Sequence, residues 1–427
     1  MFWSRFQSAT AVLTLTLLLL LGTASPAAAQ KTRLVIGHWF IPGSGGAVET
    51  YAQLMSDFIK EFQELHPEIE VVNEPYQYGI LTDGKMLVQL AIDDAPTVWL
   101  VPNVYALSFS GFLVELTERI ETSSWVREDF IEPILRANQD PQGRIWGFPQ
   151  GLQLVGLYYH TSRFEERGVA KPSTEWTWDD FAEAARKLTK ITAGNVPEYH
   201  GAAVSVYHPY SGYSLFRAYG GQPFDETGTR STLHSDAMLH AIEFMKAGLQ
   251  DQSMILGGSG ELRNVAMGFD QYVARQRMHE LGVPFDVTAV PSGPYGRFNP
   301  VVANSWVITR SASPDEQDAA WKWIEYYSSP SVQIRWAVTG DAAPANMKAA
   351  QEVFLRSDVS PPGLRDYIKS MEDADWLGVN PVWADWYPRG WRIPIERAVR
   401  GEISPAEAMI EADHVAQLAL DRYYKNQ

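Results

Sequence analysis

No cysteine occurs among the 427 residues of the sequence. This absence excludes a disulfide framework, thiolate catalysis and zinc sites built on cysteine. It also excludes a lipid anchor attached to a cysteine behind an export signal. Positive charge is scarce as well: 35 lysines and arginines stand against 51 aspartates and glutamates, for a net charge of −16. So acidic a body repels nucleic acid and anionic lipid, and we expect no nucleic-acid partner.

Long apolar runs are almost absent too. The single one extends from Ala11 to Leu21 and is shorter than the roughly 20 residues of a membrane span. Arg5 precedes it and "AAAQ" follows it, a pattern typical of a secretory signal peptide over residues 1–29 with cleavage after Ala29. We therefore expect an exported, soluble protein in a Gram-negative periplasm or, as the alternative, in the medium.

The sequence also lacks the motifs of several chemistries. It has no G-x-S-x-G hydrolase turn and no H-E-x-x-H zinc motif. His234 and His240 are six residues apart and do not share a helix face, and the "GSGG" at 43–46 matches no dinucleotide or P-loop fingerprint. We expect neither a metal site nor a cofactor. A glycoside-active enzyme stays open, because it needs only two carboxylates about 5–10 Å apart.

Hydrophobic periodicity is the clearest structural signal that is present. It predicts strands over 33–40, 69–76 and 97–102, and helices over 48–65 and 85–92. This β-α-β-α-β order favours an α/β fold with mainly parallel strands. Later in the chain Thr177, Ser313 and Ser404 are each followed three residues on by an acidic residue, which predicts three capped helix starts.

Aromatic residues make up 12% of the chain and cluster. The densest stretch, "VWADWYPRGW" at 382–391, contains Trp383, Trp386 and Trp391 and is interrupted by proline and glycine. It is either core filler at a loop or a surface that grips a flat ligand. A pyranose has apolar C–H patches that stack on a ring. Shielding about 100 Å² of ring face contributes roughly 2–3 kcal/mol.

The order of motifs over essentially the whole mature chain resembles the family 1 extracellular solute-binding proteins, the maltose-binding-protein-like receptors of carbohydrate ABC importers. The stretches that carry the resemblance include "FIKEFQELHPEIEVV", "QGRIWGFPQGLQLVGLYYH", "YGGQPF", "NSWVITRSASPDEQDAAWKWIEYYSSP" and "GDAAPA". "DDAPTVW" departs from the family with Thr97 where aspartate is common, and "YYH" departs with His160 in place of asparagine.

The resemblance implies a two-lobed, type II periplasmic binding protein fold with the ligand cleft between the lobes. Lobe 1 would comprise 30–150 plus 293–327, and lobe 2 would comprise 154–290 plus 331–427. The chain would cross between them near 151–155, 290–293 and 327–330.

The resemblance also implies ligand contacts. Trp39 ends the first strand, Gln153 lies on a hinge strand, and Asn103 is the nearest polar candidate after the third strand. The remaining positions carried over from the family are His208, Tyr210, Asp270, Tyr272, Trp306, Trp386 and Trp391.

The function implied is that of a monomeric periplasmic substrate-binding protein that delivers a sugar or short oligosaccharide to the transmembrane subunits of an ABC importer, without chemistry of its own. A polyol, a glycerol phosphodiester or a polyamine is the alternative ligand, and a phosphate would need Arg144, Arg217 or Arg263 in the cleft. A secreted glycoside-active enzyme is the alternative from another class.

Overall fold

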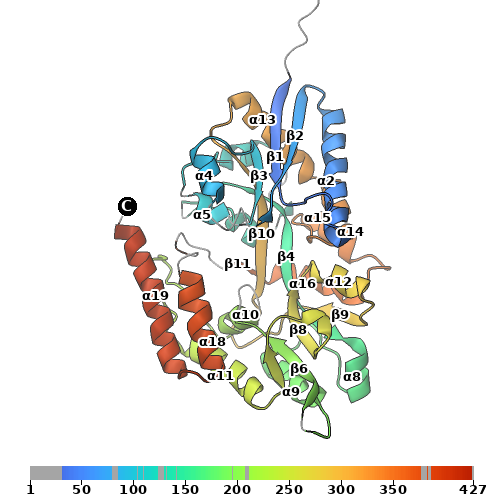
Figure 1. The fold of residues 1–427 in the computed structure, drawn as a ribbon, viewed down its shortest axis with the longest axis vertical. Coiled ribbons are helices and arrows are strands. Elements are labelled where there is room, and N and C mark those ends of the chain that lie inside the picture. The colour runs from blue at the N-terminus through green and yellow to red at the C-terminus, as the bar shows by residue number, and fades with distance from the viewer. Residues whose placement is uncertain are drawn as a thin grey trace, which may run out of the picture.

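The computed structural model describes residues 31–78, 85–102, 104–108, 110–123, 129–130, 132–140, 142–194, 196–206, 211–376, 382 and 386–425. Figure 1 shows two α/β lobes, one above the other, joined by long strands near the middle of the molecule.

The first lobe begins with the predicted alternation of strands and helices. Strands β1 (Thr32–His38), β2 (Ile69–Pro75) and β3 (Val98–Val101) follow in order, and helices α2 (Gly46–Leu65) and α4 (Lys85–Ala91) connect them. β1 pairs in parallel with both β2 and β3. The sequence prediction of this β-α-β-α-β unit is therefore confirmed.

The second lobe contains a further sheet covered by helices. Its strands include β6 (Pro197–Val204), β7 (Met254–Leu256) and β8 (Val265–Gln271), which pair in parallel. Helix α9 (Trp178–Leu188) starts at the Thr177 capping box, as predicted. The boxes at Ser313 and Ser404 are also present, because each serine oxygen accepts a hydrogen bond from the backbone three residues on.

Strand β4 (Phe148–His160) belongs to both sheets. Its first half pairs antiparallel with β10 (Asn299–Ile308), with Leu154 opposite Val301. Its second half pairs with β8 and with β9 (Phe285–Thr288). The partner change falls within the predicted crossing at 151–155. Strand β4 runs antiparallel to β8, β9 and β10, and β10 also runs antiparallel to β3, so the sheets are mixed rather than purely parallel.

Helix α14 (Pro330–Thr339) packs on the first lobe. Its Trp336 ring is 4.8 Å from that of Phe40 and 5.9 Å from that of Phe58 on α2. The predicted division instead puts residues 331–427 in the second lobe. The difference arises because the apolar face of α14 finds its cover on α2. The remaining domain limits stay a prediction.

The other elements cover the sheets or connect them. The helices are α5 (Val104–Ser108), α6 (Thr117–Thr122), α7 (Glu132–Arg136), α8 (Thr161–Arg167), α10 (Ser211–Ala218), α11 (Asp236–Gln250), α12 (Ala274–Glu280), α13 (Pro314–Tyr327), α15 (Met347–Phe354), α16 (Asp366–Glu372), α18 (Ile393–Val399) and α19 (Pro405–Lys425). The short elements are β5 (Lys190–Ile191), β11 (Ala374–Trp376), the 3₁₀ turns η2 (Gly260–Leu262) and η3 (Pro362–Arg365), and the π-helical turn η4 (Tyr387–Arg392).

Candidate functional site

An open pair of aromatic rings lies just beyond the first strand. Trp39 follows β1 directly and is partly buried. Its indole meets the exposed ring of Tyr78 edge to face, with the ring centroids 5.4 Å apart. The carboxyl end of β1 points toward the second lobe in Figure 1. Ligands of open α/β sheets bind outside the carboxyl ends of the strands, which is where this pair lies.

The neighbouring His38 holds the turn that presents Trp39. Its Nδ1 accepts the backbone N–H of Phe40 at 3.1 Å, so Nε2 carries the proton and donates it to Asn73 Oδ1 at 2.6 Å. Burial lowers the pKa of His38 to about 4. The imidazole is therefore neutral at pH 7, and it connects the end of β1 to β2.

Gln153 lies on the crossing strand β4. Its side chain is 7% exposed, and Nε2 donates to the backbone oxygen of Asp341 at 2.5 Å. Its Oε1 accepts no hydrogen bond from any residue that the structure describes. A buried amide oxygen without a donor costs free energy, so this position suits the hydroxyl of a ligand or a water molecule.

A buried carboxylate lies under the same strand. Asp341 Oδ2 accepts a hydrogen bond from Trp336 Nε1 at 2.9 Å. Nearby, Gln150 Nε2 donates to the hydroxyl of Tyr327 at 3.2 Å. Burial raises the pKa of Asp341 to about 6, against the hydrogen bonds from Trp336 and Gln150. The loop of Asp341 also bonds to β4, since Leu152 and Ala343 exchange two backbone hydrogen bonds.

Asp270 lies one strand away from Gln153, on β8 opposite Gly156 of β4. Its carboxylate accepts hydrogen bonds from Ser259 Oγ at 2.7 Å and from the backbone N–H of Gln271 at 2.9 Å. Burial raises the pKa of Asp270, which the Ser259 hydrogen bond partly offsets. The side chain is thus engaged within the second lobe.

Tyr272 and Trp306 are both buried in the core. The Tyr272 hydroxyl donates to the carbonyl of Ala337 at 3.0 Å, and its ring packs on Tyr367. The Trp306 ring packs on those of Trp323 and Tyr327. Both predicted contacts are 0% exposed. Other side chains cover their rings in this arrangement of the lobes, and a role in binding stays a prediction.

Trp386 and Trp391 lie together in the core of the second lobe, with ring centroids 6.4 Å apart. Phe224 covers Trp386 edge-on at 5.1 Å, and the Trp391 Nε1 donates to the carbonyl of Val206 at 2.8 Å. They are 1% and 3% exposed. The described part of the stretch thus packs as core rather than as an open platform, because second-lobe aromatic rings cover it.

Three predicted ligand contacts, Asn103, His208 and Tyr210, lie outside the described residues. Trp383 of the aromatic stretch lies outside them as well.

The three arginines named for a phosphate ligand all have acidic partners. Arg144 Nε is 2.7 Å from Asp140 Oδ2, and Arg217 Nε is 2.7 Å from Asp375 Oδ2. Arg263 lies on the surface beside an acidic residue. These cations are already neutralised by protein carboxylates, which disfavours an anionic ligand.

Sequence reasoning missed Tyr78, Gln150 and Asp341. Tyr78 belongs to no motif that the sequence marked as a binding site, and only the "GDAAPA" motif pointed to the region of Asp341. A hollow of about 550 Å³ lies elsewhere, beside Gly220, Asp225 and Glu226, and none of the predicted site residues that the structure describes lines it. The described ranges contain no cluster of three or more metal-ligating side chains. Over those same ranges, no helix is both long and apolar enough to cross a membrane.

Comparisons with known proteins agree with this arrangement. A family model described as bacterial extracellular solute-binding protein matches residues 45–334, more than half of the chain. The arabinooligosaccharide-binding protein of Bacillus subtilis (strain 168) is 24% identical over 224 residues, which is 49% of this chain and 47% of that protein. The melibiose/raffinose/stachyose-binding protein MelE of the same organism is 21% identical over 186 residues, 43% of this chain and 40% of that protein. The matches thus span less than half the length of these curated relatives.

Solved structures match over nearly the whole chain. The cyclic alpha-maltosyl-1,6-maltose binding protein from Arthrobacter globiformis superposes with a TM-score of 0.77 at 15% identity, covering 92% of this chain and all of that one. The sugar-binding protein MalE from Xanthomonas citri gives a TM-score of 0.75 at 18% identity, with 93% and 100% covered. At such identities the likeness establishes the fold, which is the two-lobed fold expected from the sequence.

Proposed function

Because the chain belongs to the bacterial extracellular solute-binding proteins, we propose that it is the substrate-binding protein of an ABC importer. It binds a sugar or a short oligosaccharide between its lobes and delivers it to the transmembrane subunits. It acts as a monomer and catalyses no reaction. The relatives whose names state a ligand are named for oligosaccharides, which supports this class of ligand.

The observation that carries the proposal is the open pair of Trp39 and Tyr78. A ring face left partly exposed at the carboxyl end of a strand is suited to stack on the apolar face of a pyranose. The edge-to-face contact fixes the orientation of the indole before a ligand arrives. Less side-chain freedom is then lost on binding, which favours affinity.

Hydrogen bonds at the rim complete the proposed site. Gln153 offers an oxygen that takes no bond from the described residues, and an amide can both donate to and accept from sugar hydroxyls. Asn103, His208 and Tyr210 add further contacts in the proposal. Trp386 and Trp391 support the second-lobe side, and the paired state of Arg217 favours a neutral ligand over a phosphodiester.

A thermal-shift screen followed by calorimetry tests the ligand class. We expect arabinose and galactose oligosaccharides or maltodextrins to raise the melting temperature, with a Kd in the micromolar range, about −8 kcal/mol. If only a polyol, a glycerol phosphodiester or a polyamine raised the melting temperature, the ligand would not be a carbohydrate oligomer. Turnover of a chromogenic glycoside would instead establish an enzyme.

Export is tested separately. Family membership indicates an exported protein, and we propose a signal peptide over residues 1–29 and a periplasmic location. N-terminal sequencing of the mature protein should begin at Gln30. Recovery of the full-length chain in the membrane fraction would contradict this proposal.

A further inference from the structure

Strand β11 (Ala374–Trp376) lies at the edge of the first sheet and is tied to the second lobe by charge. It pairs in parallel with the start of β10, Asn299 to Val301, and packs beside α7 of the first lobe. Two aspartates lie at this strand: Asp373 directly precedes it, and Asp375 is its middle residue. Each carboxylate forms an ion pair with an arginine.

The first arginine comes from the second lobe. Arg217 lies on α10, a helix whose Leu215 and Phe216 are buried in the second-lobe core. Its Nε donates to Asp375 Oδ2 at 2.7 Å, and its Nη1 donates to the carbonyl of Gly221 at 2.7 Å. The side chains of Arg217 and Asp375 are only 11% and 20% exposed. Water and salt therefore screen this pair less than a surface pair.

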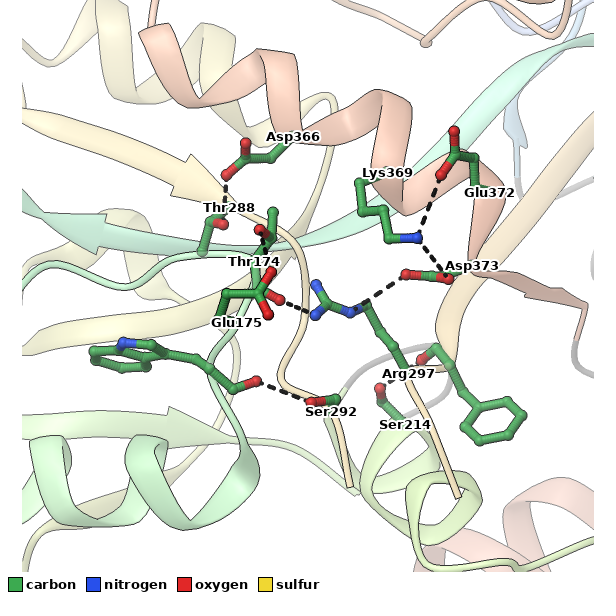
Figure 2. A network of polar contacts seen from close by, with 12 residues as sticks. Thr174, Glu175, Ser214, Thr288, Ser292, Arg297, Asp366, Lys369, Glu372 and Asp373 are labelled. Atoms are coloured by element: carbon green, nitrogen blue, oxygen red, sulfur yellow. Dashed lines mark hydrogen bonds and ion pairs between the residues drawn. The ribbon is translucent and has the colours of Figure 1, made fainter. Parts of the chain in front are cut away.

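The second arginine lies on the connection that enters β10. Figure 2 shows Arg297 between Asp373 on one side and Thr174 on the other. Its Nε is 3.4 Å from Asp373 Oδ2, and its Nη2 donates to the carbonyl oxygen of Thr174. Thr174 belongs to the stretch that leads into α9 of the second lobe. Lys369 reaches the other oxygen of Asp373, with Nζ 3.6 Å from Oδ1.

We propose that the pairs Arg217–Asp375 and Arg297–Asp373 form an interlobe clamp that fixes the angle between the lobes and thereby sets the affinity of the site between them. Arg217 joins Asp375 directly to helix α10 of the second lobe. Arg297 joins Asp373 to the second lobe through its own hydrogen bond to the carbonyl oxygen of Thr174. A rotation of one lobe on the other must stretch the Arg217–Asp375 pair and the bridge from Asp373 through Arg297 to Thr174. The consequence for affinity rests on the proposed function; the consequence for the lobe angle does not.

The clamp also lies between two stretches that carry predicted ligand contacts. Helix α10 starts at Ser211, directly after Tyr210, and β11 ends ten residues before Trp386. The four charged residues act as positioning residues, since they hold these stretches in place without touching the ligand. Without the clamp the free protein samples more lobe angles, so a smaller fraction is competent to bind and the apparent Kd rises in proportion.

The absence of native cysteines allows a direct measurement. Lys60 on α2 and Ala247 on α11 are both exposed. Spin labels attached to Lys60→Cys and Ala247→Cys report the distance between the lobes by pulsed electron paramagnetic resonance. The test variant carries Asp373→Asn and Asp375→Asn, which keep the shape and remove the charge. The matched control is Asp318→Asn. It breaks the pair with Arg119, 2.6 Å apart, which joins α6 to α13 within the first lobe.

We expect the interlobe distance distribution of the ligand-free test variant to broaden, while that of the control matches the wild type. Calorimetry with arabinotriose, raffinose and maltotriose should give an affinity about tenfold weaker for the test variant. A further variant keeps Asp373 and carries only the conservative replacement Asp375→Glu. Its interlobe distance distribution should be narrower than that of the test variant. Thermal unfolding of each variant verifies that the protein is folded.

Three results would overturn the clamp. An unchanged distribution in the folded test variant shows that the pairs do not set the lobe angle, whatever the ligand. A broadened distribution with unchanged affinity shows that the angle does not set binding. An equal effect in the control shows that the loss of an ion pair within one lobe has the same effect as the loss of the proposed clamp. If none of the three sugars binds the wild type, the carbohydrate proposal fails for them, and the distance measurement still decides the clamp.

Discussion

The indole of Trp39 meets the phenol ring of Tyr78 with an interplanar angle of 86° and a centroid separation of 5.4 Å. Trp39 comes from the end of β1, and Tyr78 comes from the segment after β2. Tyr78 is 51% exposed. The two parallel strands therefore end in one aromatic surface, which has an oriented ring and an open side.

Replacing Trp39 by alanine should weaken carbohydrate binding by about 2–3 kcal/mol, the contribution of one lost ring face. The melting temperature should change little, because this ring is only partly buried. Calorimetric titration and thermal unfolding measure the two effects on the same sample.

Trp386→Ala is the matched comparison. Because Trp386 is 1% exposed and covered by Phe224, its loss should lower the free energy of unfolding by about 3–5 kcal/mol. Normal sugar affinity in Trp39→Ala would remove this ring from the site. If Trp386→Ala kept its stability but lost sugar binding, the ring that stacks on the sugar would be Trp386 of the 382–391 stretch.

Asp341→Asn should change how stability depends on pH. Burial raises the pKa of Asp341 to about 6, above its ordinary 3.8. Between these values the folded state holds a proton that the unfolded state has released, so the free energy of unfolding falls as pH rises. Asparagine does not titrate, so the free energy of unfolding of the variant does not fall with pH for this reason. Its free energy of unfolding relative to wild type should therefore rise by about 2 kcal/mol from pH 4 to pH 7. Urea unfolding at both pH values measures this, and a constant difference would refute it.

His38→Asn should act in the opposite direction. Burial lowers the pKa of His38 to about 4, below its ordinary 6.5. As the pH falls from 6.5 toward 4, the unfolded state binds a proton at His38 that the folded state does not bind, so the free energy of unfolding of the wild type decreases. Relative to wild type, the variant should gain about 2 kcal/mol between pH 7 and pH 5. Denaturant titrations decide this. If the free energy of unfolding changed equally with pH in both proteins, His38 would be more hydrated in the folded state than its burial indicates.

Gly151→Ala should destabilise the crossing strand. A Cβ at Gly151 would lie 2.8 Å from the Cβ of Ala342 and 3.0 Å from the carbonyl oxygen of Ala343. Overpacking of this kind costs about 1–3 kcal/mol. Gly194→Ala is the control, since a Cβ there meets nothing within 4 Å. Thermal unfolding should separate the two, and equal melting temperatures would mean that the Asp341 loop yields to the added methyl group.

The features that the sequence predicted best depend on neighbours along the chain. The spacing of Phe58 and Phe62 defined the buried face of α2, and both are 0% exposed. The acidic residue three positions after Thr177 defined the start of α9. Such signals lie within one or two turns of a helix, so periodicity and capping are enough to read them.

The environments of the candidate site residues depend on distant partners. The carbonyl that takes the Trp391 hydrogen bond is 185 residues away, at Val206. The side chain of Gln153 donates to the backbone oxygen of Asp341, 188 residues away. A tryptophan that lines a cleft and one that fills a core look alike in sequence, and only the tertiary contacts distinguish Trp39 from Trp386.

Strand β4 also constrains how the gene can change. Its residues up to Leu154 pair with the first sheet and those from Val155 onward pair with the second, so no cut in the reading frame yields two fragments that both keep a complete sheet. Recombination that exchanges one lobe for that of a relative would have to splice inside this strand. It would also have to keep the alternation of β4 side chains between the two faces of the sheet, both before and after the splice point. We therefore expect the lobes to have been inherited together, with change in ligand preference confined to substitutions rather than exchange of modules.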